Sequence, residues 1–105
     1  MSFRDAQKDV HGWISQFKVG YFKPLEILAA ISEETGELAR ELNNRYGPRT
    51  KKSPEDTADV EKEISDIIFN LICLANSHDI DLDEAWSKKM HKQETRDKER
   101  FEKKD

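Results

Sequence analysis

Apolar residues recur at helical spacing from the first residues of the chain. Between residues 3 and 17 they return every three or four positions, and Ser2 with Asp5 three residues later forms a capping-box pattern. This pattern predicts a first helix with an apolar stripe made of Phe3, Ala6, Val10, Trp13, Ile14 and Phe17. Gly20 and Pro24 follow, and proline at a first helical position predicts that a second helix begins at Pro24.

The second and third predicted helices are longer. The second is expected to run to about Arg45, before the Y-G-P sequence at residues 46–48 ends it. A basic loop at residues 49–52 follows. The S-P-E-D sequence at residues 53–56 then predicts an N-cap with proline at the first helical position, and the third helix extends to about Ala75.

Asp81, with Glu84 three residues later, forms another capping-box pattern and predicts a fourth helix through Ala85, Trp86 and Met90. Residues 93–105 are almost all charged, so we expect a solvated helix end or a disordered tail. The chain shows no strand alternation, internal repeat or glycine-rich phosphate loop. The expected architecture is an all-α four-helix bundle at residues 1–92, followed by a charged C-terminal tail at 93–105.

Two acidic motifs lie inside helices that otherwise look like core: E-E-T-G-E at residues 33–37 and E-I-S-D at residues 63–66. At about 100° per residue, Glu34 falls beside the second helix's apolar stripe, and Glu37 lies one turn further on. That stripe comprises Ile27, Ile31, Leu38 and Leu42. On the third helix Glu63, Asp66 and Asn70 flank a stripe made of Val60, Ile64, Ile67, Leu71 and Leu74. Both helices therefore bring acids to one seam.

Carboxylates at such a seam cost free energy unless they are paired, protonated or bound to a cation. Neither stripe carries Lys or Arg. A hard divalent cation such as Mg²⁺ or Mn²⁺ prefers oxygen ligands and keeps waters for a phosphate-bearing substrate. The two motifs together predict a metal site. The alternative is that these are solvated surface acids, which is the usual fate of Glu in a chain that is 38% charged.

Length, charge and cysteine usage narrow the class of protein. A chain of 105 residues forms one domain, and a formal net charge of -4 argues against nucleic acid as the main partner. Cys73 is the only cysteine, which excludes an internal disulfide and fits a reducing compartment. With no signal peptide and no apolar run of about eighteen residues, we expect a cytoplasmic protein that does not enter a membrane.

The order of these features resembles the MazG-type nucleotide pyrophosphohydrolases of the all-α NTP pyrophosphatase superfamily, especially small stand-alone bacterial members of the YpjD type. The likeness covers about residues 21–92: E-E-x-x-E, a basic loop, E-x-x-D, an Asn-rich turn and D-L-D-E-A-W at 81–86. The resemblance implies a Mg²⁺-dependent enzyme that hydrolyses a nucleoside triphosphate to the monophosphate and pyrophosphate. It also implies four metal ligands: Glu34, Glu37, Glu63 and Asp66.

Further site residues are expected around this metal. Glu33 is the candidate catalytic acid, either binding a further ion or positioning the attacking water; a plain surface acid is the alternative. Asn70 is a candidate contact for the sugar or phosphates, with a satisfied core amide as the alternative. The resemblance implies phosphate contacts from basic residues of the fourth helix, and aromatic residues near the N-terminus offer stacking on a base or simply core. These candidates are Lys89, Lys92 and Arg96, for which solvated surface cations are the alternative, and Trp13, Phe17 and Phe22.

We also expect a homodimer or homotetramer, as in relatives of the family. Several large apolar residues point away from the main stripes or cluster early in the chain, namely Trp13, Phe17, Phe69 and Ile72. Base specificity stays open, because residues 22–26 read F-K-P-L-E where dCTP-directed relatives carry H-x-P-R-N.

Two other classes of protein compete with the hydrolase. A carboxylate-bridged di-iron or di-manganese bundle requires Glu three residues before His. The residues at those positions are Lys8, Ala75 and Lys88, which argues against it. A non-catalytic helical partner-binding module stays open, and metal binding separates it from the enzyme.

Overall fold

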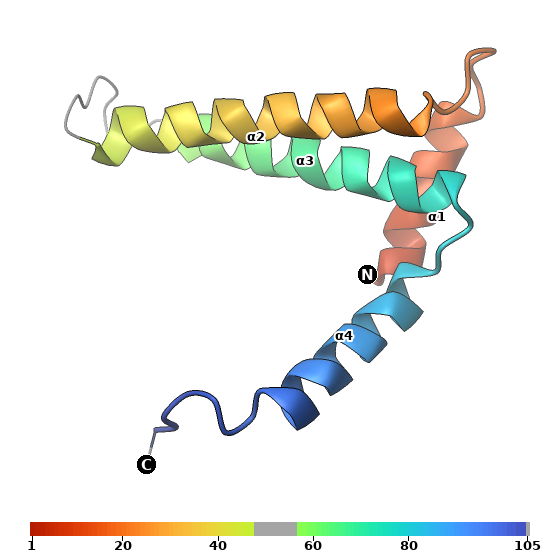
Figure 1. The fold of residues 1–105 in the computed structure, drawn as a ribbon. Coiled ribbons are helices and arrows are strands. Elements are labelled where there is room, and N and C mark those ends of the chain that lie inside the picture. The colour runs from red at the N-terminus through yellow and green to blue at the C-terminus, as the bar shows by residue number, and fades with distance from the viewer. Residues whose placement is uncertain (48–56, 105) are drawn as a thin grey trace.

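The computed structural model describes residues 1–47 and 57–104, which form four helices and no strand (Figure 1). They are α1 (Phe3–Ile14), α2 (Pro24–Tyr46), α3 (Thr57–Ser77) and α4 (Leu82–Arg96). The expected all-α class with four helices is confirmed. The helix start expected at residues 53–56 lies outside the described residues. Among the described helices, none is long and apolar enough to cross a membrane.

Local chemistry sets the helix ends. The Ser2 hydroxyl accepts from the Asp5 backbone nitrogen, and the Asp5 carboxylate accepts from that of Ser2, so the predicted capping box is confirmed. The Asp81 side chain caps α4 by accepting from the backbone nitrogens of Asp83 and Glu84. Only this half of the capping box predicted at Asp81 and Glu84 is present, because the Glu84 carboxylate pairs with the Lys88 ammonium at 3.3 Å. The sequence predicted these starts because caps depend on residues within one turn.

The end of α3 is a Schellman turn. The Ile80 backbone nitrogen donates to the Ala75 carbonyl at 2.9 Å, and the Asp79 nitrogen donates to the Asn76 carbonyl at 3.2 Å. Asp79 occupies the left-handed position with φ of 54°. A side chain at such a position costs free energy that glycine avoids.

α2 and α3 lie side by side as an antiparallel hairpin, and α1 packs across the end where α2 begins and α3 finishes (Figure 1). The buried apolar cluster sits at this junction and consists of Val10, Ile27, Ile72 and Cys73. Ile72, expected to point away from the core, is only 5% exposed. That expectation was wrong, because α1 packs on this part of α3 and Ile72 joins the buried cluster with Val10 and Ile27.

Further along the hairpin, the stripes expected to form the core are partly exposed. Leu42 on α2 is 40% exposed, and Ile64 and Leu71 on α3 are 44% and 46% exposed. Since α1 covers only one end and α4 leaves the hairpin, each long helix has only the other to pack against along this stretch (Figure 1). The prediction that these stripes are core therefore holds near α1, where Ile27 is buried, and is wrong for Leu42, Ile64 and Leu71.

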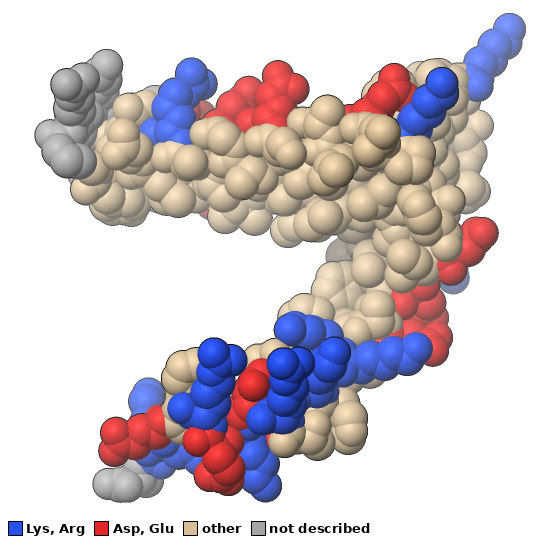
Figure 2. Space-filling model, in the orientation of Figure 1, with Lys and Arg blue, Asp and Glu red and all other residues tan. Residues whose placement is uncertain are grey.

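α4 diverges from the hairpin and is attached to α1 (Figure 1). The Asp83 carboxylate accepts from the backbone nitrogens of Phe3 and Arg4 at 3.0 and 3.3 Å, which caps the first turn of α1. The Arg4 guanidinium pairs with Asp81 at 2.7 Å, and the rings of Phe3 and Trp86 lie 5.7 Å apart. Figure 2 shows charges of both signs crowded on α4 and beyond it, whereas the hairpin face in view is mostly uncharged.

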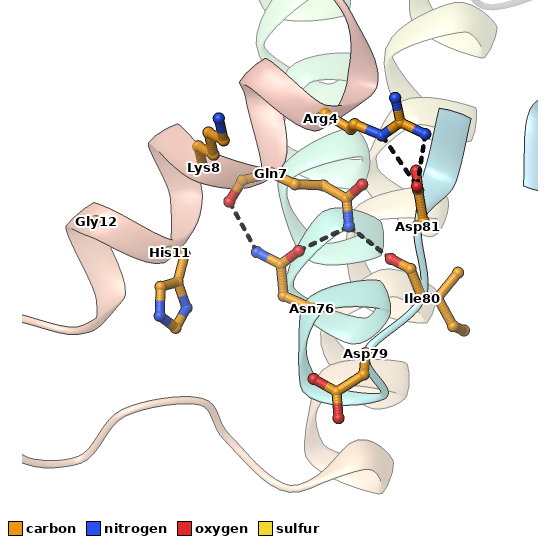
Figure 3. A pocket seen from close by; sticks show the side chains of 9 residues that line it. All are labelled: Arg4, Gln7, Lys8, His11, Gly12, Asn76, Asp79, Ile80 and Asp81. Atoms are coloured by element: carbon orange, nitrogen blue, oxygen red, sulfur yellow. Dashed lines mark hydrogen bonds and ion pairs between the residues drawn. The ribbon is translucent and has the colours of Figure 1, made fainter. Parts of the chain in front are cut away.

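A polar junction holds α1 against the turn between α3 and α4 (Figure 3). The Gln7 amide nitrogen donates to Asn76 Oδ1 at 2.8 Å and to the Ile80 carbonyl at 2.7 Å. Asn76 Nδ2 donates in return to the Gln7 carbonyl and to the Tyr21 hydroxyl, both at 3.0 Å. Gln7, Asn76 and Ile80 border an open groove of about 570 Å³ that shares no residue with the acidic motifs. Its amides already satisfy one another, so the junction is structural.

Candidate metal centre

Three carboxylates converge between α2 and α3. One oxygen from each of Glu34, Glu37 and Glu63 lies within 4.8 Å of the other two. Glu34 and Glu37 are one helical turn apart on α2, and Glu63 faces them from α3. Glu63 is only 7% exposed, while Glu34 and Glu37 are half-buried. The two helices thus place three acids in a partly desolvated seam, as the periodicity predicted.

Crowding perturbs the protonation of this group. The pKa of Glu34 rises from 4.5 to about 7, first through a hydrogen bond with Glu63, then through burial and repulsion by Glu37, Glu63 and Asp66. Glu34 and Glu63 each keep one buried oxygen, Oε2, without a hydrogen-bond partner. Buried acceptors of this kind call for a proton or a cation.

The donor set fits a hard divalent cation. It consists entirely of carboxylate oxygens, which suit Mg²⁺ or Mn²⁺, whereas thiolate and imidazole donors would favour softer metals. The unpartnered oxygens of Glu34 and Glu63 are available as ligands. The geometry can therefore hold an ion of the kind that bridges phosphate oxygens.

Asp66, the fourth expected ligand, lies outside this group of three. Its Oδ2 accepts a hydrogen bond from the Lys62 ammonium at 2.9 Å, and the same ammonium lies 3.7 Å from Glu63 Oε1. Sequence reasoning looked for cations only on the apolar stripes and so missed Lys62. The spacing of four residues between Lys62 and Asp66 was the available signal.

Glu33, the candidate catalytic acid, is exposed and does not belong to the group of three. Asn70 is half-buried, and its Nδ2 donates to the Asp66 backbone carbonyl at 3.0 Å. It helps to line a cavity of about 190 Å³ whose walls are mostly apolar or aromatic. The lining residues are Ile14, Phe17, Val19, Gly20, Tyr21, Phe22, Ile27, Phe69, Asn70 and Cys73.

The cavity joins three of the expected substrate residues, Phe17, Phe22 and Asn70, and adds Tyr21, which sequence reasoning did not assign. Trp13 does not line it, but its ring meets the Phe17 ring edge-on at 5.1 Å. Phe17 lies beyond the end of α1, so its place in the cavity depends on the chain reversal before α2 and was not readable from helical spacing.

The basic residues expected to contact phosphates lie on α4. Lys89, Lys92 and Arg96 are all exposed, and the Lys89 ammonium donates to Gln93 at 3.0 Å. Because α4 diverges from the hairpin, a single chain does not bring these residues together with the acids (Figure 1).

Comparisons with known proteins point to one family. The family model of the MazG nucleotide pyrophosphohydrolase domain matches residues 22–101. The uncharacterized protein YpjD of Bacillus subtilis (strain 168) is 52% identical over 104 residues, covering 99% of this chain and 94% of its own length. The crystal structure of YpjD from Bacillus subtilis superposes with a TM-score of 0.83, covering 90% of this chain and 97% of that one. A Bacillus-conserved MazG protein, described as a nucleotide pyrophosphohydrolase, is 44% identical with a TM-score of 0.78, covering 94% and 96%.

Proposed function

Because the chain belongs to the MazG nucleotide pyrophosphohydrolase family, we propose that it hydrolyses a nucleoside triphosphate to the monophosphate and pyrophosphate. We further propose that the reaction requires Mg²⁺, for which Mn²⁺ can substitute. The observation that carries the proposal is the meeting of Glu34, Glu37 and Glu63 within 4.8 Å, inside the matched region. House-cleaning of the cytoplasmic nucleotide pool is the role we assign to this activity, with canonical or damaged triphosphates as substrates.

Each acid has a role in the proposed mechanism. Glu34, Glu37 and Glu63 would hold the ion, and Asp66 would complete the ligand set. When bound, the ion neutralises charge on the phosphates and lowers the pKa of a bound water. Glu33, exposed beside Glu34, positions the attacking water. Deprotonation of Glu34, whose pKa is about 7, frees the oxygen that the ion needs.

The apolar cavity beside Asn70 is the proposed base pocket. Asn70, one helical turn after Asp66, connects the cavity to the acidic seam. Its side chain borders the cavity and donates a hydrogen bond to the Asp66 backbone carbonyl. Phe17 offers a ring for stacking, and the Trp13 ring packs edge-on against it. We propose that the base stacks on Phe17 and that Asn70 contacts the sugar. The aromatic walls suit any base, so the pocket does not by itself select one.

We also propose a homodimer built from two α2–α3 hairpins, with a tetramer as the larger alternative. The chain exposes 8574 Å², about 2,500 Å² more than a compact monomer of this mass. The radius of gyration is 17.4 Å, where a compact chain of this length has about 13 Å. Pairing of the half-exposed stripes would bury such an excess, as obligate homodimers do. It would also let Lys89, Lys92 and Arg96 of one chain approach phosphates bound to the other.

A nucleotide panel tests the activity. Purified protein is incubated with each triphosphate and Mg²⁺, and products are separated by anion exchange; we expect a monophosphate and pyrophosphate from at least one substrate. EDTA and the Glu63→Gln substitution should each abolish the products, whereas Glu102→Gln, which removes an exposed tail charge, should not. Direct release of orthophosphate, or activity that survives EDTA, would refute the mechanism. Failure to take up Mg²⁺ or Mn²⁺ in calorimetry would favour the non-catalytic binding module.

A further inference from the structure

Lys62 is a cation lying directly against the acidic seam. Its ammonium is 2.9 Å from Asp66 Oδ2 and 3.7 Å from Glu63 Oε1. It also interacts electrostatically with Glu34 on the neighbouring helix. The Lys62 side chain is 64% exposed, so the ammonium approaches from the solvent side. A single ammonium group thus interacts with carboxylates of both helices.

Helix stabilisation does not account for this arrangement. A lysine four residues before an acid is the less favourable order on a helix, and exposed ion pairs contribute little stability. Lys88 and Glu84 on α4 form a comparable exposed pair in the favourable order, and within residues 1–47 and 57–104 no other carboxylate forms an ion pair with Lys88. Lys62 differs from Lys88 in having several carboxylates near it. One of them is the buried Glu63, which keeps an oxygen without a hydrogen-bond partner.

We propose that Lys62 is a built-in counter-ion of the metal centre, which holds Asp66 in the metal-free protein and yields it to the divalent cation. This inference rests on the proposed metal site. Asp66 lies outside the group of three carboxylates, and one of its oxygens is occupied by Lys62. The ammonium and the metal ion therefore compete for the same oxygen. The long exposed stem of Lys62 lets its ammonium leave without disturbing the core.

Two roles of Lys62 can be told apart, because they predict opposite effects of its removal on metal affinity. If Lys62 only oriented Asp66 for the metal, its removal would weaken metal binding. If it competes, removal frees Asp66 and also removes a charge that repels the ion. We therefore expect Lys62→Met to bind Mn²⁺ about two- to fivefold more tightly than wild type, a range set by the strength of exposed ion pairs.

The test is a Mn²⁺ titration followed by electron paramagnetic resonance of the free ion, at low and constant ionic strength. Wild type is compared with Lys62→Met, with Lys62→Arg, which keeps the charge, and with Lys88→Met, which breaks the matched pair on α4. We expect tighter binding only for Lys62→Met. Thermal melts provide a second readout: in EDTA this variant should melt below wild type, and Mn²⁺ should raise its melting temperature by more.

The outcomes separate the two proposals. If wild type takes up neither Mn²⁺ nor Mg²⁺, the metal site fails and the counter-ion role fails with it. If wild type binds Mn²⁺ but Lys62→Met binds equally or more weakly, the metal site stands and the counter-ion role is overturned. Tightening in Lys88→Met as well would also overturn it, because the effect would then be one of net charge alone.

Discussion

Glu34→Gln tests whether the crowded carboxylates control both stability and metal binding. With its pKa raised from 4.5 to about 7, Glu34 holds a proton in the native state that the unfolded chain has already released between these pH values. The native state therefore binds more protons than the unfolded state in this window, so the metal-free protein loses stability as pH rises from 4.5 to 7. Glutamine keeps the shape and cannot ionise. The variant should lose this slope and, above pH 7, be at least as stable as wild type in EDTA.

The same proton sets the size of the metal effect. Metal binding below pH 7 must displace up to one proton from Glu34, so metal affinity should fall by up to about tenfold per pH unit there. At a hundredfold excess over Kd, the metal adds about 2.7 kcal/mol to the free energy of unfolding. For a domain of this size, that raises the melting temperature by on the order of 10 °C. Glu34→Gln loses a ligand and should gain much less.

Thermal melts from pH 4.5 to 8, in EDTA and in millimolar Mg²⁺ or Mn²⁺, measure both effects, and a pyrophosphate assay should find the variant inactive. Glu33→Gln is the matched control for stability: it removes the neighbouring acid, which lies outside the group of three, and should keep the pH slope of wild type. Full activity in Glu34→Gln would refute the reasoning. So would a wild-type melting temperature that ignores both metals.

Three further substitutions test the assembly and the turns. Leu71→Glu places a charge on the half-exposed stripe of α3 and should convert the oligomer to monomer in sedimentation velocity; a monomeric wild type would contradict the proposed pairing. Asp79→Gly relieves the left-handed position and should raise the free energy of unfolding by about 0.5–1 kcal/mol in urea melts, and a loss would show that Asp79 stabilises its own turn. Asp83→Ala removes the acceptor for two backbone nitrogens of α1 and should cost about 1 kcal/mol, with faster amide exchange in α1's first turn; unchanged exchange would argue against this cap.

The sequence predicted the features of the fold that depend on residues close together in the chain. Ser2, Pro24 and Asp81 mark helix starts through contacts within one turn. The meeting of Glu34 and Glu63 followed from periodicity alone, because two antiparallel helices with acids along the edges of their stripes bring those edges together. The direction of α4 was not readable, since it depends on Asp83 reaching Phe3, 80 residues away in the chain.

Burial was harder to predict than position. Periodicity identifies an apolar stripe but not what covers it, so Ile64 and Leu71 were expected in the core of one chain and are instead half-exposed. Lys62 was missed for a related reason. Lys62 lies one helical turn before Asp66 on the same face of α3, but cations were sought only on the apolar stripes.

The position of the acidic seam connects the small core to the proposed chemistry. The buried apolar cluster closes one end of the hairpin, where α1 packs on α2 and α3, and the seam lies further along, where the two long helices have only each other. Carboxylates there remain near water, so an ion and its phosphate ligand can enter, yet Glu63 is buried enough to favour a bound cation. Filling this region with apolar residues would stabilise the hairpin but leave no ligands. The chain therefore has its proposed metal site where its own core ends, and there the proton on Glu34, the ammonium of Lys62 and a divalent cation would each neutralise carboxylate charge.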